Sequence, residues 1–395
     1  MRKRQFPCRK ASATLLVALA WALPLQSAKA IVGPNWGLEN VPVERLIKNL
    51  EALAKNDPKN VQVRFNLARA HSMAYALRTD TVPARKNGEE TAGLFGNGSP
   101  YVSFTPAPTD DKDKLKAARE HLAKAIEQYE QVLKLAPDTL EAALGYAWCV
   151  DQSGQKRKAV EEYRKVINAA WEKEKDLKRA GMYWHSITAE AAGCLIPLLD
   201  KDRDTEEIKT LEEHIKQMNK VNRPISPIVI PLRNSLTLGE LENHSANVAF
   251  DADGSGLRKH WTWISKDAGW LVNDPHHTGK VTSALQFFGN VTFWMFWENG
   301  YQALAALDDD RDGMLSGKEL EGLAVWQDLN HNGVSDPGEV KPLAEWGIVA
   351  ISCRHVTDTT HPDRIAYSTR GVFFSDGSNR PTYDIILHPA IATVE

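Results

Sequence analysis

The stretch that decides the C-terminal half of the chain is residues 307–339, LDDDRDGMLSGKELEGLAVWQDLNHNGVSDPGE. It contains two oxygen-rich turns, Asp308 to Glu319 and Asp328 to Glu339, with eight residues between them. In each turn acidic or amide side chains alternate with other residues, Gly stands at the sixth position and Glu at the twelfth. Calcium takes six to eight oxygen ligands, so the chain must curl tightly and point alternate side chains inward. The stretch therefore predicts two calcium sites.

The candidate ligands stand at positions 1, 3, 5, 7, 9 and 12 of each turn, which is the ligand spacing of an EF-hand loop. In the first turn they are Asp308, Asp310, Asp312, Met314, Ser316 and Glu319. In the second turn they are Asp328, Asn330, Asn332, Val334, Asp336 and Glu339. Residues at position 7 contribute a backbone carbonyl, and a bidentate Glu at position 12 favours calcium over magnesium. Because the second turn carries fewer acids, we expect it to bind calcium more weakly.

Two poorer versions of the pattern lie upstream. The segment AFDADGSGL offers Asp251, Asp253 and Ser255, but Thr262 stands at its twelfth position, so the loop at 251–262 is a weaker candidate for a third calcium site. The loop at 274–285 has Leu285 at the twelfth position. We expect this second loop to keep the turn without the metal.

Length and composition set the wider frame. The chain has 395 residues, 43% of them hydrophobic, which suggests two or three domains. Its 48 Lys and Arg residues nearly balance 51 Asp and Glu, so nothing indicates a nucleic-acid-binding protein. Residues 1–30 join a basic start, MRKRQFPCRK, to a short apolar run and the small residues Ala28 and Ala30. They predict a signal peptide, and hence export to the periplasm or beyond a bacterial cell, rather than a membrane anchor, because Pro24 interrupts a run too short to span.

The first half has the apolar spacing of helices. Ala125, Tyr129 and Val132 recur as Ala159, Tyr163 and Val166, a shift of 34 residues, which is the period of a tetratricopeptide repeat. A generic helical bundle is the alternative. The predicted domains are a helical domain over 31–222 with an insertion at about 78–113, a linker over 223–230, and a calcium-binding domain over 231–395.

These motifs carry two resemblances. The first half resembles tetratricopeptide repeats. The second half resembles the EF-hand-type calcium-binding module of large RTX-type bacterial exoproteins. The segments that carry this resemblance are AGWLV, VWQDLNHNGVSDPGE and LAEWGIVAIS. Together they imply an α-helical repeat array plus a small α+β EF-hand-type domain. Since only GKELEGLAVWQ separates the strong loops, one short helix is expected to serve both.

In part of that exoprotein family the module cuts itself at an Asp-Pro bond, the Asp carboxylate attacking its own carbonyl. This chain has Ser226-Pro227 at the corresponding place, so the resemblance implies that self-cleavage is absent. We therefore predict no catalytic residues.

Aromatic residues concentrate in the second half, among them Trp261, Trp263, Trp270 and Trp346. They predict the hydrophobic core of a domain that bound metal ions stabilise. A sugar-binding face is the alternative. Cys149, Cys194 and Cys353 would remain after removal of the signal; buried thiols or one disulfide both fit.

The predicted function is an exported, non-enzymatic calcium-binding protein. Its helical repeats would bind an unknown protein partner, as a scaffold or adaptor, and Ca²⁺ would hold the C-terminal domain in shape. The alternatives are a calcium-dependent hydrolase or self-processing module, and a dockerin-like assembly module. The loops of a dockerin are spaced more widely than the 20 residues found here.

Overall fold

The computed structural model describes residues 41–78, 111–176, 186–218, 225–252, 258–295 and 297–390. All of them lie within one compact unit that spans Pro34–Glu395. The predicted signal peptide, 1–30, and nearly all of the predicted insertion at about 78–113 fall outside the described residues. No helix among the described residues is long and apolar enough to cross a membrane.

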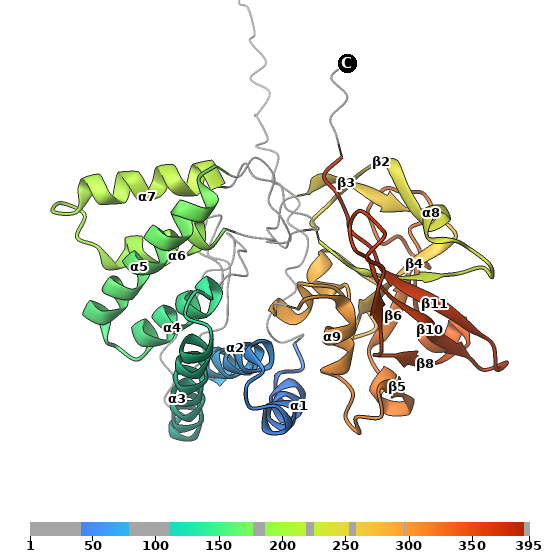
Figure 1. The fold of residues 1–395 in the computed structure, drawn as a ribbon, viewed down its shortest axis with the longest axis horizontal. Coiled ribbons are helices and arrows are strands. Elements are labelled where there is room, and N and C mark those ends of the chain that lie inside the picture. Colours follow the sequence, from blue (N-terminus) through green and yellow to red (C-terminus); the bar gives the residue numbers. More distant parts are fainter. Residues whose placement is uncertain are drawn as a thin grey trace, which may run out of the picture. The chain divides into compact units, whose positions relative to one another are not determined.

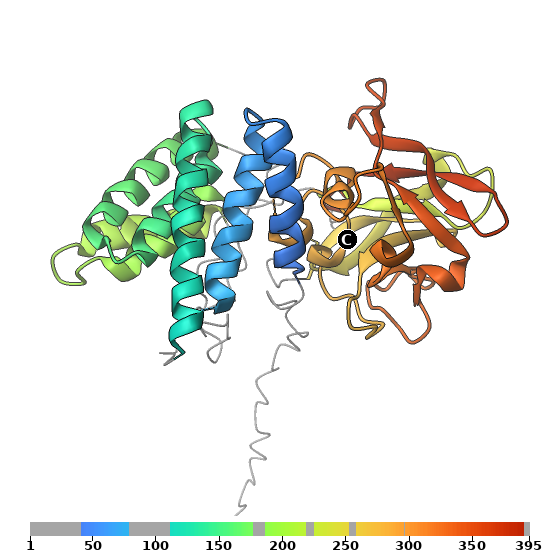
Figure 2. The same cartoon turned by 90° about the horizontal axis from the view of Figure 1, so that it is seen from below.

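The first half is helical (Figure 1). Its elements are α1 (Val43–Asn56), α2 (Val61–Arg78), α3 (Lys112–Leu135), α4 (Leu140–Gln152), α5 (Lys156–Glu174), α6 (Ile187–Leu195), the 3-10 turn η2 (Ile196–Leu198) and α7 (Thr205–Met218). Helices that follow one another along the chain pack together, and α1, α2 and α3 stand side by side (Figure 2). Pro137 and Gly154 fall between helices: proline cannot continue a helix, and Gly154 adopts the left-handed backbone (φ 84°) that ends one.

The residues that recur after 34 positions all face the core. Ala125, Tyr129 and Val132 on α3 are fully buried, and Ala159, Tyr163 and Val166 on α5 are buried in the same way. Small residues let the helices approach closely, and Gly145 on α4 is the tightest case: a Cβ there would lie 2.3 Å from Cζ of Tyr129.

Gly145→Ala is expected to destabilise the helical half. The added methyl overlaps a tyrosine ring that has no room to move, which costs about 1–3 kcal/mol and outweighs the ~1 kcal/mol that Ala gains over Gly in a helix. Urea unfolding followed by the helical signal measures the difference. The matched control is Gly239→Ala, where a Cβ meets nothing within 4 Å and no loss is expected. Equal stability of the two variants would show that the α3–α4 packing is looser than described.

The second half is built on a curled antiparallel sheet with the strand order β5-β8-β10-β11-β1-β4-β6-β7 and β9 paired to β10 (Figure 1). The strands are β1 (Ile228–Pro231), β4 (Ala268–Asn273), β5 (Met314–Ser316), β6 (Leu323–Trp326), β7 (Val340–Pro342), β8 (Ile348–Ser352), β9 (Val356–Thr357), β10 (Ala366–Phe374) and β11 (Asn379–Asp384). A separate ribbon joins β2 (Glu242–Phe250) to β3 (Lys259–Ile264). Short helical elements connect them: α8 (Leu238–Leu241), α9 (Gly300–Ala305), η3 (Ala284–Gln286), η4 (Thr292–Trp294), η5 (Gly317–Leu320) and η6 (Leu343–Trp346).

The central strands follow from their sequences. IVIP, AGWLVN and LAVW are apolar without alternation because every residue of β1, β4 and β6 is buried. Ile228–Ile230, which the sequence placed in a linker over 223–230, form part of β1 between β4 and β11. Strands β10 and β11 form a hairpin: β10 pairs with β11, and Gly377 at φ 83° lies in the turn between them.

The aromatic residues fill this half's core. Trp261, Trp263, Trp270 and Trp326 are each less than 2% exposed. Trp263 packs edge-on against both Trp270 and Trp326, with ring centroids 5.1 and 5.8 Å apart. The prediction of an aromatic core is confirmed for Trp261, Trp263 and Trp270, whereas Trp346, also named for that core, is only half-buried. Cys149, Cys194 and Cys353 are free thiols.

Candidate metal centre

The first oxygen-rich loop, Asp308 to Glu319, lies between α9 and β6 and includes β5 and η5. Arg311 (φ 64°) and Gly313 (φ 87°) both adopt left-handed backbone, which curls the chain at positions 4 and 6. Arg311 bears a side chain in a conformation that favours glycine, and a tight turn is where such a residue is found. The curl brings Asp308, Asp310 and Asp312 together, with one carboxylate oxygen from each within 4.8 Å of the others.

Backbone N–H groups orient these carboxylates. Asp308 accepts hydrogen bonds from the N–H of Arg311 at 2.7 Å and of Gly313 at 2.9 Å. Asp310 accepts from the N–H of Asp312, and Asp312 accepts from the N–H of Met314. Each carboxylate oxygen has two lone pairs, so it can accept an N–H and still bind a cation.

Glu319 closes the loop from its twelfth position. Its Oε1 accepts from the N–H of Asp309 at 2.6 Å and its Oε2 from the N–H of Ser316 at 3.0 Å. Both Asp308 and Glu319 are buried. Burial raises the pKa of the Asp308 carboxyl, and the neighbouring carboxylates of Glu319 and Asp312 add to that rise. A cation among these oxygens would offset both effects.

The second loop, Asp328 to Glu339, repeats this bonding except at position 1, where the second donor is the N–H of position 5 and not of position 4. Asp328 accepts from the N–H of Asn332 and Gly333, and Asn330 accepts from the N–H of Asn332. Asn332 accepts from the N–H of Val334 at 2.7 Å. Glu339 accepts from the N–H groups of positions 2 and 9, Leu329 and Asp336, as Glu319 does in the first loop. His331 and Gly333 supply the same left-handed pair at φ 57° and 65°.

The two loops differ in charge. In the second loop the amide nitrogens of Asn330 and Asn332 both donate to Oδ2 of Asp336, at 2.8 and 2.9 Å. Burial also raises the pKa of the Asp328 carboxyl. Two amides thus take the places that two aspartates hold in the first loop, which agrees with weaker cation binding at the second.

The loop at 274–285 keeps the curl but not the ligands. Asp274 accepts from the N–H of Gly279 at 2.8 Å, and His277 (φ 50°) and Gly279 (φ 65°) have left-handed backbone. Thr278 also donates to Asp274 through its N–H and its hydroxyl. The expected turn is therefore present in this loop.

The two strong loops do not pair with each other. The hydroxyl of Ser335, at position 8 of the second loop, accepts from the N–H of Val281, at position 8 of the 274–285 loop, at 2.9 Å. Leu315, at position 8 of the first loop, pairs with Ile351 of β8. Each strong loop is therefore joined to a different neighbour, not to the other.

The expected short helix shared by the two strong loops is wrong. The residues between them form the end of η5 and then strand β6. LAVW is buried at all four positions and pairs with β4 on one side and β7 on the other, so sheet pairing outcompetes the helical pattern. In the weaker site, Asp251 is buried, whereas Asp253 and Ser255 lie outside the described residues.

Residues distant in sequence hold the loops, and no local pattern in the sequence points to them. Nη2 of Arg258 donates to the carbonyls of Asn332 and Gly333, at 3.2 and 3.0 Å. Nη2 of Arg354 donates to the carbonyl of Asp312. On α1, Asn49 donates to Oδ1 of Asp309 at 3.0 Å, next to the first ligand.

One family model matches part of the second half. Residues 237–388 match the family model of the SPM domain. The match covers less than half of the chain. The iron-regulated protein FrpA of Neisseria meningitidis serogroup C is 35% identical to this chain over 111 residues. That alignment spans 27% of this chain and 10% of FrpA, so only a small part of the relative is represented.

The SPM match corrects the resemblance inferred from the sequence. We expected tetratricopeptide-like repeats followed by an EF-hand-type module of RTX-type exoproteins. The second half instead matches the SPM domain and is a curled antiparallel sheet, while the first half is simply helical. The physical difference lies at the loop flanks: an EF-hand has a helix on each side, whereas the second loop here runs from β6 to β7.

Proposed function

We propose that this chain is a calcium-binding protein in which two cations stabilise the C-terminal sheet. The single observation that supports it is the bonding of the two loops. In both loops the N–H of position 6 donates to position 1, that of position 5 to position 3, that of position 7 to position 5, and those of positions 2 and 9 to position 12. Two independent turns that converge on one arrangement of oxygens are more than a solvated acidic face.

The chemistry of the donor set favours calcium. All side-chain ligands offer oxygen, the closing residue is a glutamate that can bind through both oxygens, and position 7 offers a carbonyl. Magnesium demands near-octahedral geometry and keeps its water, and zinc favours nitrogen and sulfur. Carboxylates from three neighbouring positions give the first loop the higher expected affinity.

The remaining parts of the proposal follow from the sequence. Residues 1–30 have the charge and apolar pattern of an export signal, and outside the cytosol a site of millimolar affinity would be filled. In the helical half, the recurrence of buried residues after 34 positions supports a stack of helix pairs, which offers a surface for a protein partner. We propose a binding role, as scaffold or adaptor, without catalysis.

Native mass spectrometry of the full chain tests the calcium assignment. Titration with calcium should add two ions, the first at lower concentration than the second. Magnesium at equal concentration serves as the control and should add fewer ions, because its geometry does not suit the bidentate glutamates. A chain that retains no calcium, or binds magnesium equally well, would rule the assignment out. A third bound ion would point to the loop at 251–262.

A further inference from the structure

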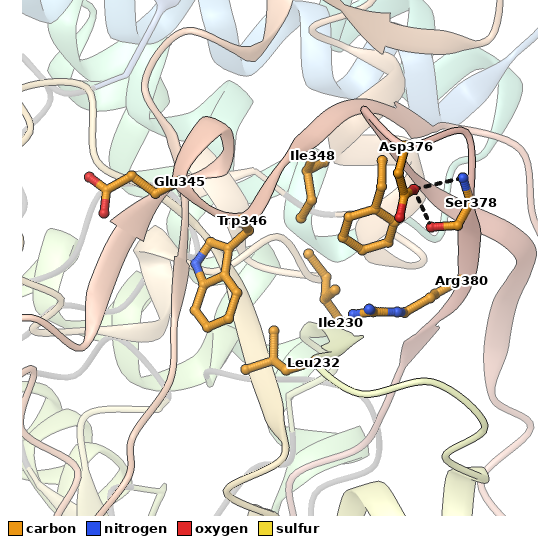
Figure 3. Close-up of a pocket in the computed structure, with 9 residues that line it drawn as sticks. Ile230, Leu232, Glu345, Trp346, Ile348, Asp376, Ser378 and Arg380 are labelled. Carbon is orange, nitrogen blue, oxygen red and sulfur yellow. Dashed lines mark hydrogen bonds between the residues drawn. The ribbon is translucent and has the colours of Figure 1, made fainter.

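A pocket of ≈ 320 Å³ opens at the end of the curled sheet, in a part of the molecule that the calcium loops do not use (Figure 3). Four adjacent strands contribute to it: Ile348 from β8, Phe374 from β10, Arg380 from β11 and Ile230 from β1. Trp346, at the end of η6, forms one wall. The volume is at the small end of the range for ligand pockets, enough for one small ring compound.

Arg380 is held in place before any ligand arrives. Its guanidinium lies over the ring of Phe374, 4.3 Å from the centroid. Its Nε donates to Oδ1 of Asn234 at 2.7 Å, and its Nη1 donates to the carbonyl of Pro231 at 3.1 Å. A guanidinium has five N–H donors, and these two bonds leave others for a ligand. In Figure 3 the guanidinium ends beside Ile230, and Trp346 lies on the other side of Ile230.

An acceptor stands beside this donor. Oδ1 of Asp376 accepts from both the N–H and the hydroxyl of Ser378, at 2.9 and 2.6 Å (Figure 3). These bonds fix the carboxylate in its turn and leave Oδ2 without a hydrogen bond among the described residues. The polar edge of the pocket therefore presents a planar donor and a fixed acceptor together.

The opposite wall is aromatic. Trp346 is half-buried, unlike Trp261, Trp263, Trp270 and Trp326. Lys341, which does not line the pocket, lies 5.5 Å from the centre of its ring, so one face is covered and the other remains. With Ile230 and Leu232 beside it, this wall is apolar.

We propose that the pocket binds a neutral pyranose sugar. An anion would meet Asp376 and Glu345, and a cation would meet Arg380, so neither charge suits the pocket. A purely apolar ligand would leave the fixed donor and acceptor without partners, which costs free energy. A sugar ring satisfies both walls: its C–H face packs on Trp346, while adjacent hydroxyls accept from Arg380 and donate to Asp376.

Saturation-transfer NMR on the full chain tests this directly. The probes are the methyl glycosides of glucose, galactose, mannose and N-acetylglucosamine, with acetate and ethylammonium as charged comparisons. At least one glycoside is expected to bind with the weak affinity of a single ring, and the ions are not. Arg380→Lys should reduce sugar binding by about tenfold or more, because a lysine cannot reproduce the planar pair of donors.

Arg370→Lys is the matched control. Arg370 lies over the ring of Phe373 at 4.9 Å, the same kind of contact, but it does not line the pocket. Asp376→Asn gives a second pocket variant that keeps the turn. A thermal melt of each variant confirms folding. Absence of binding by all four glycosides, preferential binding of acetate or ethylammonium, or sugar binding that survives both pocket variants would each overturn the proposal. The calcium assignment is unaffected by any of these results.

Discussion

Removal of calcium is expected to lower the melting temperature of the full chain by ~10 °C or more. A ligand that binds only the folded state contributes about 2.7 kcal/mol when its concentration is 100 times the dissociation constant. Two such sites contribute about 5 kcal/mol, a large part of the total stability of an ordinary domain. For a domain of this size, each kcal/mol corresponds to about 2–4 °C. Scanning calorimetry with EDTA and with excess calcium measures the shift.

The loss of stability on calcium removal should affect the second half of the chain. The first loop contributes β5, which pairs with β8, and the second loop connects β6 to β7. Seven of the 12 tryptophans follow residue 225, and Trp261, Trp263, Trp270 and Trp326 among them are buried. Unfolding of the second half should therefore change tryptophan fluorescence while the helical signal of the first half persists. Excess magnesium added to the EDTA sample is the control and should not restore the melt. If the sample in EDTA melted at the same temperature as the sample in excess calcium, the metal would not stabilise this half.

The loops were the most predictable feature because their geometry is local. The curl depends on Gly313 and Gly333, and every bond that orients the carboxylates of Asp308 and Asp328 closes within six residues. A spacing of residue types within twelve positions is therefore enough to fix which oxygens converge. The helical half was predictable for a similar reason, since helical apolar spacing is also local.

The flanks of the loops were not predictable in the same way. LAVW is compatible with one helical turn or with a strand, and only its pairing with β4 and β7 decides. Those partners lie far away in sequence or beyond the next loop. Arg258 and Arg354, which hold the loops, looked like ordinary surface charges. The pocket is even harder to predict from the sequence. Its residues Ile230, Trp346 and Arg380 come from three separate segments, and only the curl of the sheet brings them together.

Glu339→Gln is expected to abolish most terbium luminescence, whereas Glu319→Gln should leave it largely intact. Terbium substitutes for calcium and emits when a nearby tryptophan transfers energy to it. Nε1 of Trp326 donates to Oε2 of Glu339 at 3.3 Å, so this indole touches a ligand of the second loop. Glutamine keeps the size of the side chain but removes the charge and one ligand oxygen, and we expect the affinity to fall by about 100-fold.

Calcium binding should show the complementary pattern. Each of the two variants should retain one ion by native mass spectrometry, and Glu319→Gln should lose the tighter one, because its loop places three aspartates within 4.8 Å. Glu321→Gln is the control: Glu321 is exposed, follows η5 and belongs to neither ligand set. If Glu339→Gln retained full luminescence, or if the two variants lost signal equally, terbium would not be bound in the second loop beside Trp326. Terbium luminescence thus reports on the second loop, beside Trp326, and the number of calcium ions retained by each variant reports on the first.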